Sequence, residues 1–148
     1  MKIVGTNIFI HYLLDGDRAN EAEELLASHS DLAVTIGVVN EVIFVIIRCL
    51  AKRRLGIKAL SKLKEYIRTK GLDFALDMLK EYAKMLQEFE IIILRDYAGL
   101  GELIETMVKY NLTPSDAIIA LTCKYYGINT ILTFDEDFKR IPWLKVIP

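Results

Sequence analysis

The sequence has few cysteines and histidines, the residues that stabilise small folds through disulfides or bound zinc. It contains only two cysteines and two histidines, all widely separated, and no Cys-x-x-Cys pair. Structural zinc sites and disulfide frameworks need such residues in clusters, so neither is expected. Cys49 and Cys123 lie in apolar, helix-like surroundings, and we interpret them as buried thiols of a protein in a reducing compartment.

Long uninterrupted apolar runs are also missing. The longest candidate, residues 38–50, is broken by Asn40, Glu41 and Arg48, whereas a membrane-spanning helix needs roughly 20 apolar residues. The apolar run at the N-terminus is too short for a signal peptide. We therefore expect a soluble, cytoplasmic protein that makes no membrane contact.

A charge excess of either sign is absent. The chain has 19 basic and 20 acidic residues, so its total charge does not indicate nucleic-acid binding, although a local basic patch can still provide it. The hydrophobic fraction of 53% and the mean hydropathy of +0.28 predict a packed core rather than disorder. Because we find neither a repeat nor a linker, we predict a single domain over residues 1–148.

Apolar, β-forming runs alternate with helix-periodic segments along the chain. We expect strands at 1–4, 32–35, 89–94, 129–133 and 144–147. We expect helices at about 6–13, 18–28, 37–52, 97–110 and 113–127. This alternation predicts an α/β fold of three layers (α/β/α), with a central parallel sheet of four to five strands. The Ile-rich run 89–94 predicts a strand covered on both faces.

One segment interrupts the alternation. Residues 56–88 keep helical periodicity except near Lys70–Gly71, where Gly after Lys is typical of a helix end. We predict two helices that form a helical hairpin insertion, whose many apolar residues favour a subunit or partner interface. Arg54, Lys58 and Lys62 recur at four-residue spacing and would share one face of its first helix, either against an RNA backbone or as a solvated surface.

Glu41 is the most informative single residue, because it lies in a helix that is apolar nearly all round. A lone buried carboxylate costs several kcal/mol, so it needs a partner, a proton or a metal. We therefore interpret Glu41 as a site residue. The alternative is a helix-face carboxylate that reaches water or a lysine.

Three further acids fall at the ends of predicted strands or at helix starts, where open parallel sheets bind ligands. Asp116 follows the helix cap Thr113, so it either stabilises that helix end or serves a site. Asp135 and Asp137 follow the strand at 129–133, where turn acids are also common. Carboxylates gathered at one edge repel each other, and Mg²⁺ or Mn²⁺ is the usual counter-charge. Such an ion would activate water against a phosphodiester.

Four blocks together carry a resemblance to a known family. They are Gly5-Thr6-Asn7-Ile8-Phe9 after a strand, Glu41 in an apolar helix, Thr113-Pro114-Ser115-Asp116, and Thr133-Phe134-Asp135-Glu136-Asp137. In this order and spacing the chain resembles a PIN domain over essentially its whole length. It is most similar to the VapC-type toxin ribonucleases of prokaryotic toxin–antitoxin pairs.

The resemblance implies a metal-dependent endoribonuclease that uses Mg²⁺ or Mn²⁺. It assigns catalysis and metal binding to Glu41, Asp116 and Asp135, with Asp137 as an accessory ligand. It assigns orienting roles to Thr6, Asn7 and Thr133, and implies that the Thr133 hydroxyl holds an acid of the first block. The implied partners are RNA, a small antitoxin protein and a second copy of the chain.

Gly5 departs from the family pattern, which begins Asp-Thr-Asn or Asp-Ser-Asn. Glycine supplies no ligand, and Asp15 and Asp17 lie beyond a helix and cannot replace it. The glycine is either a natural degeneration, a deliberate inactivation or a cloning variant. We expect this chain to bind Mg²⁺ weakly and to cleave RNA poorly or not at all, since the loss of even a supporting partner typically costs 10- to 100-fold.

Two other functions stay open. Residues 4–7 join a strand to a helix whose N-terminus can hold a phosphate, although neither GxGxxG nor the P-loop pattern GxxxxGK(S/T) occurs. The second is a catalytically inactive PIN-like protein that binds a partner or RNA. Substitution of Gly5 by Asp discriminates them, because only a dormant nuclease would regain activity.

Overall fold

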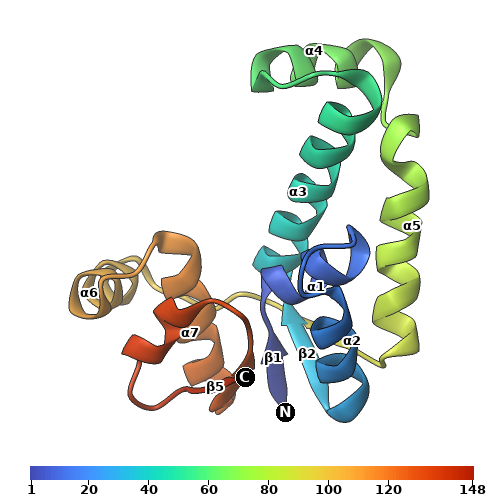
Figure 1. Ribbon diagram of the computed structural model, residues 1–148. Coiled ribbons are helices and arrows are strands. Elements are labelled where there is room, and N and C mark those ends of the chain that lie inside the picture. Colours follow the sequence, from blue (N-terminus) through green and yellow to red (C-terminus); the bar gives the residue numbers. More distant parts are fainter.

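Strands and helices alternate along the chain in the computed structural model, which describes all 148 residues (Figure 1). The strands are β1 Lys2–Val4, β2 Leu32–Thr35, β3 Ile92–Leu94, β4 Thr130–Leu132 and β5 Lys145–Ile147. The helices are α1 Thr6–Leu13, α2 Ala19–Ser28, α3 Ile36–Leu55, α4 Leu60–Lys70, α5 Asp73–Glu88, α6 Leu100–Tyr110, α7 Pro114–Tyr126 and the 3₁₀ helix η1 Glu136–Arg140.

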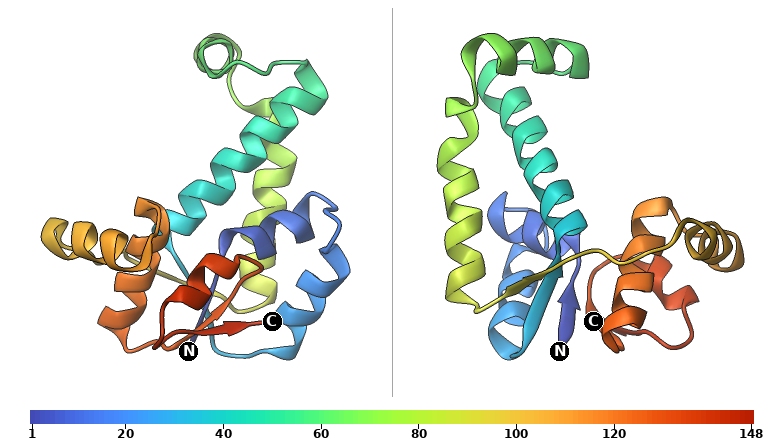
Figure 2. Two further views of the ribbon diagram at one scale, coloured as in Figure 1. Left: turned by 60° about the vertical axis from the view of Figure 1, so that its left-hand side comes forward. Right: turned by 180° about the vertical axis from the view of Figure 1, so that it is seen from behind.

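All five strands are parallel, in the order β3-β2-β1-β4-β5. Helices α1, α2 and α5 lie on one side of the sheet and α6 and α7 on the other (Figure 2). The predicted α/β/α fold with a parallel sheet is therefore confirmed. The central strands β1, β2 and β4 form the core, where Ile3, Val34 and Ile131 are fully buried. None of the helices combines the length and apolarity needed to cross a membrane.

Local signals fix the helix that carries Glu41 and the helix that carries Asp116. The Thr35 hydroxyl accepts a hydrogen bond from Val38 N at the start of α3, and the Thr113 hydroxyl caps α7 in the same way. These bonds satisfy backbone N–H groups that a helix start leaves free. At its far end α3 stops at Gly56, whose φ of +67° is a left-handed conformation that favours glycine.

The strand predicted to be covered on both faces is instead an edge strand. β3 pairs with β2 alone, and Ile92 and Ile93 are 48% and 52% exposed. A continuous apolar run predicts a strand but not its place in the sheet. The prediction of cover on both faces was wrong, because Ile92 and Ile93 point to opposite faces of the strand and both are about half exposed. The outer edge of β3 is unpaired as well.

The predicted hairpin helices form, but they are not antiparallel neighbours. α5 runs back alongside α3, and α4 lies across the far ends of both (Figures 1 and 2). Because α3 ends at Gly56, Arg54 lies in α3, Lys58 in the following loop and Lys62 in α4. The four-residue spacing predicted that the three residues share one face of one helix. That prediction was wrong, because they lie in three different segments.

Candidate active site

Three neighbouring strands, β2, β1 and β4, end at one edge of the sheet, and the candidate site lies beyond that edge. A pocket of about 250 Å³ opens there. Its walls come from the β1–α1 junction, α3, the start of α7 and the segment after β4. Its lining includes Gly5 and seven polar residues, which are Thr6, Asn7, His11, Glu41, Asp116, Thr133 and Asp135. Segments that are distant in sequence thus meet where parallel sheets bind ligands.

Asp116, Asp135 and Asp137 form a group of acids that is close enough together to bind a cation. Each offers a carboxylate oxygen, and these oxygens all lie within 4.8 Å of one another. Burial raises the pKa of the Asp116 carboxyl above its usual value. The charges of Asp135, Glu41 and Asp137 raise this pKa further, while hydrogen bonding to Thr113 opposes them. An all-oxygen donor set under mutual repulsion suits a hard divalent cation.

Glu41 lines the pocket, but it is exposed rather than buried. The predicted burial of Glu41 was therefore wrong, and no burial cost obliges this carboxylate to find a metal. The reason is that its side of α3 faces the open pocket, which leaves the carboxylate exposed. Thr6 nevertheless fixes the side chain, since its hydroxyl donates to Glu41 Oε2 at 2.9 Å.

Asp135 and Asp137 also do the local work that turn acids do. Asp135 Oδ1 accepts a hydrogen bond from Asp137 N at 2.9 Å and so caps η1. Asp137 is exposed and forms an ion pair with Arg140. Capping and cation binding are compatible for Asp135, because a carboxylate has about four lone-pair sites. Asp137 is less available, since its partner Arg140 competes with a cation.

A hydrogen-bond network ties the β1–α1 junction to the segment after β4. Thr133 Oγ1 donates to Asn7 Oδ1 at 3.2 Å and accepts from Asp135 N at 3.1 Å. The same Asn7 oxygen accepts from Phe134 N at 3.1 Å. The network holds the carboxylate of Asp135 at the pocket wall. Thr6, Asn7 and Thr133 therefore lie where orienting residues would be needed.

Gly5 faces the Thr133 hydroxyl across this network. A Cβ atom at position 5 would lie 3.0 Å from Thr133 Oγ1 and 3.4 Å from the Leu132 carbonyl oxygen. The backbone of Gly5 is extended, with φ −81° and ψ 163°, so any residue can adopt it. A larger side chain at position 5 therefore needs a shift of a few tenths of an ångström in Thr133. The carboxylate of an aspartate at this position would enter the pocket beside the Thr133 hydroxyl.

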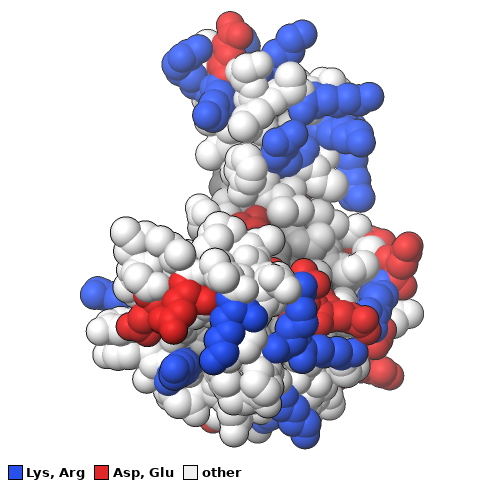
Figure 3. All heavy atoms as spheres, turned by 90° about the vertical axis from the view of Figure 1, so that its left-hand side faces the viewer, with Lys and Arg blue, Asp and Glu red and all other residues white.

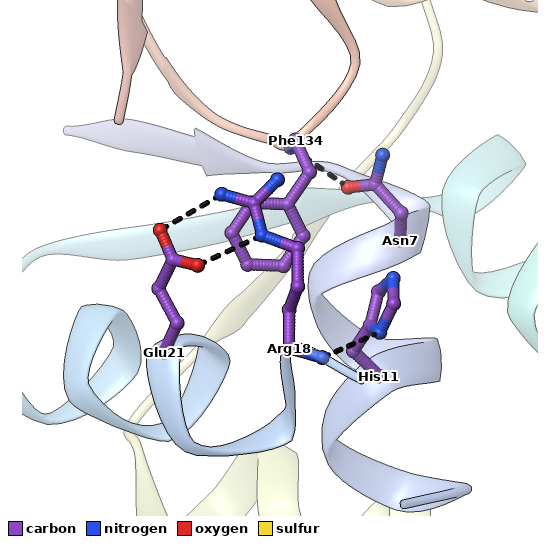
Figure 4. Close-up of polar contacts among 5 residues, drawn as sticks. All are labelled: Asn7, His11, Arg18, Glu21 and Phe134. Atoms are coloured by element: carbon purple, nitrogen blue, oxygen red, sulfur yellow. Dashed lines mark hydrogen bonds and ion pairs between the residues drawn. The ribbon is translucent and has the colours of Figure 1, made fainter. Parts of the chain in front are cut away.

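His11 is a pocket residue that the sequence argument passed over as isolated. It lies four residues after Asn7 on α1, and this spacing places both side chains on one helix face. Arg18 N donates to His11 Nδ1 at 3.2 Å (Figure 4), so the hydrogen of the neutral ring lies on Nε2. The Arg18 guanidinium stacks on Phe134 at 3.7 Å and pairs with Glu21 at 2.8 Å, which braces the same segment.

Comparison with known proteins decides the family. A profile of the PIN domain matches residues 2–144. The chain belongs to the PIN domain family. It is 35% identical to Ribonuclease VapC2 of Methanocaldococcus jannaschii over 111 residues, which are 74% of this chain and 67% of that protein. It is 54% identical to Ribonuclease VapC6 of the same organism over 39 residues, 26% of each chain.

Solved structures agree with the PIN fold. VapC20 of Mycobacterium tuberculosis, described as a toxin that cleaves the sarcin–ricin loop, superposes with a TM-score of 0.66 over the full length of both chains. VapBC2 from Rickettsia felis, bound to a DNA fragment of its promoter, gives 0.59 over 99% of this chain and 96% of that one. Both are only 20% identical in sequence to this PIN chain, so the likeness concerns the fold alone. The predicted resemblance is thereby confirmed.

Proposed function

We propose that this PIN chain is a metal-dependent endoribonuclease of the VapC type, the toxin of a toxin–antitoxin pair, and that Gly5 impairs it. The observation that carries the proposal is the convergence of Asp116, Asp135 and Asp137, whose oxygens lie within 4.8 Å of one another. Gly5 and Thr133 line the adjoining pocket. The curated relatives are named ribonucleases, which supports an RNA substrate.

The residues present fit Mg²⁺ or Mn²⁺. Asp116 and Asp135 would hold the ion, with Glu41 and Asp137 as nearby acids. Burial raises the pKa of Asp116, and the charges of Asp135, Glu41 and Asp137 raise it further, which is consistent with a site that a cation would stabilise. Such an ion supplies an acidified water and stabilises charge on a phosphodiester. The chain itself orients these acids: Thr6 holds Glu41, and Thr133 holds the backbone of Asp135.

The defect at Gly5 follows from the same geometry. An aspartate there would add a carboxylate next to Thr133, whereas glycine leaves the ion one ligand short. Activity then falls at least as far as the 10- to 100-fold typical of losing a supporting partner. A catalytically inactive PIN protein that binds RNA or a partner is the second candidate function, and Gly5 itself favours it.

The test is cleavage of a mixed set of structured and single-stranded RNAs by this chain and by Gly5→Asp, each with Mg²⁺, Mn²⁺ or EDTA. Gly5→Asn is the matched control, because it occupies the same space without the charge. The nuclease proposal predicts that Gly5→Asp alone cuts strongly and that EDTA stops it. If Gly5→Asp stays inactive with every metal, the inactive binding protein becomes the better description.

We also propose that the protein acts in the cytoplasm as a homodimer and binds a small antitoxin. The related complex from Klebsiella pneumoniae is titled a toxin–antitoxin complex, which supports the antitoxin. An apolar strip on α6 supports the dimer: Leu100, Ile104 and Val108 are 75%, 53% and 73% exposed. They recur at four-residue spacing, so they share one helix face, and an exposed apolar face of this kind marks an interface.

A further inference from the structure

Basic residues are concentrated in the part of the chain that projects farthest from the sheet. Nine of the 19 lysines and arginines lie within residues 48–70, which contain a single acid, Glu65. The rest of the chain holds ten basic residues and 19 of the 20 acids. In Figure 3, many lysines and arginines (blue) lie on the projecting part at the top, and most aspartates and glutamates (red) lie on the body below it. Although the net charge of the chain is near zero, positive charge is therefore concentrated in residues 48–70 and negative charge in the rest of the chain.

A groove of about 450 Å³ runs along α3 at the base of this basic region. Its lining includes Phe44, Val45, Arg48, Lys52 and Lys58. Val45 also lines the candidate active-site pocket. The groove and the pocket are therefore neighbours on the same helix.

One face of α3 connects the two hollows and changes its charge along the way. Glu41, Val45, Arg48 and Lys52 are spaced by four, three and four residues, so they line up on one side of the helix. Eleven residues at 1.5 Å rise span about 16 Å, which accommodates a few nucleotides of an extended strand. The acidic end of this face lies at the candidate active site, and the basic end points away from it.

The cations of the groove have no acidic partners. Arg54, by contrast, is bound to Asp77 at 2.8 Å, whereas Arg48, Lys52 and Lys58 form none of the ion pairs in the structure. Arg48 Nη2 donates to the Lys58 carbonyl at 3.2 Å, which holds its guanidinium at the groove wall. Unpaired cations at a groove are available to an anionic ligand.

Phe44 adds an aromatic surface to these charges. Its side chain is 45% exposed, and Arg48 Cζ lies 5.9 Å from its ring centroid. Exposed aromatic rings beside cations are what proteins use to bind single-stranded nucleic acid, because bases stack on the ring while phosphates contact the cations. A purely acidic peptide without apolar side chains would use the cations but not the ring.

We propose that the α3 groove binds an unpaired RNA strand and leads it to the candidate active site. Phe44 stacks on a base, and Arg48, Lys52 and Lys58 contact the phosphates. This inference rests on the proposed ribonuclease function and specifies its substrate as single-stranded RNA at this position. The sequence predicted Arg54, Lys58 and Lys62 as RNA contacts, whereas this proposal keeps Lys58 and assigns the other contacts to Arg48 and Lys52.

The test is fluorescence anisotropy of the full chain with a fluorescein-labelled, unstructured RNA of about 12 nucleotides, titrated in EDTA at several salt concentrations. The triple variant Arg48→Gln, Lys52→Gln, Lys58→Gln is expected to reduce the slope of log Kd against log salt by about 2, at about 0.7 for each phosphate contact. Phe44→Leu is expected to weaken binding about 5-fold or more without changing the slope.

The matched control neutralises three exposed lysines outside the groove, Lys80, Lys84 and Lys145, and is expected to bind like the parent. Circular dichroism melts verify that every variant is folded. Three results would overturn the inference. They are groove variants with parental affinity and slope, a duplex of the same sequence that binds as tightly as the single strand, or a polyglutamate peptide of equal charge that displaces RNA as well as unlabelled RNA does.

Cleavage by Gly5→Asp separates this inference from the proposed function. If Gly5→Asp cuts RNA and the groove substitutions leave its kcat/KM unchanged, the nuclease stands and the groove is refuted. If Gly5→Asp does not cut but the groove substitutions reduce RNA binding, the groove stands and the nuclease is refuted.

Discussion

Asp116→Asn is expected to stabilise the protein at pH 7 in EDTA. Asp116 sits among acids whose oxygens lie within 4.8 Å, and two unit charges about 5 Å apart repel by about 0.8 kcal/mol in bulk water and about 3 kcal/mol at an effective dielectric constant of 20. Asp116 is only half-buried, so we take a value near the lower bound. A gain of about 1 kcal/mol raises the Tm of a chain of this size by roughly 2–4 °C, which scanning calorimetry resolves.

The stability change caused by Asp116→Asn should also depend on pH. The pKa of Asp116 is raised by burial first and by neighbouring charges next, so the folded state holds its proton more tightly than the unfolded state does. Stability is then lost as the pH rises from the unfolded Asp value of about 3.9 through the folded pKa. Asparagine does not titrate. The advantage of Asp116→Asn should therefore be small near pH 4 and grow towards pH 7.

Metal reverses the order of stability. An ion present at ten times its Kd stabilises the parent by about 1.4 kcal/mol, and Asp116→Asn should lose most of that gain with Mn²⁺ or Mg²⁺. Asp17→Asn, an exposed acid remote from the pocket, is the control and should behave as the parent does. The reasoning is refuted if Asp116→Asn is no more stable than the parent at pH 7 in EDTA, because repulsion would then be weaker than the helix-dipole attraction that asparagine gives up.

Three further substitutions test the fold around the site and its surfaces. Thr133→Val removes the acceptor of Asp135 N and the donor to Asn7, so it should cost about 1–3 kcal/mol in urea unfolding; an unchanged midpoint would show that the network is not needed. Tyr82→Phe removes a buried hydroxyl that has no hydrogen-bond partner, and we expect Tm to stay level or rise, with a fall contradicting the assignment. Ile104→Glu places a charge in the exposed α6 strip and should give folded monomers in light scattering, whereas a persisting dimer would show that the dimer interface lies elsewhere.

The sequence predicted well where one residue type has a local reason for its position. Thr113 followed by Pro114 marks a helix start whatever surrounds it, so Asp116 was correctly placed at the beginning of α7. Thr133 and Asp135 were correctly placed because an apolar strand before them ends at the edge where parallel strands end together. The convergence of Asp116 and Asp135 in one pocket is thus a consequence of local signals combined with a parallel sheet.

The errors concern what lies next to an element, which local patterns do not contain. Glu41 stands in a helix that is apolar in sequence, but its side chain faces the open pocket and is exposed. The Ile-rich β3 has the composition of a covered strand, yet it lies at the sheet edge. Ile92 and Ile93 of β3 have the apolar character of buried positions although they are exposed in the single chain, which is consistent with a second protein surface beside β3.

Under the proposed function, Gly5 replaces the first acid of the site, and its surroundings indicate how that replacement arose. The hydroxyl of Thr133, the polar atom nearest to a Cβ at Gly5, is not idle, because it bonds to Asn7 and to the backbone of Asp135. The orienting network and the three-acid cluster are therefore both present beside Gly5, and under the proposed function the chain lacks a single carboxylate. A site long free of selection would be free to lose these acids, whose repulsion costs stability. Their retention favours a recent or artificial replacement of the first acid, and it is the reason to expect that a single substitution, Gly5→Asp, restores cleavage.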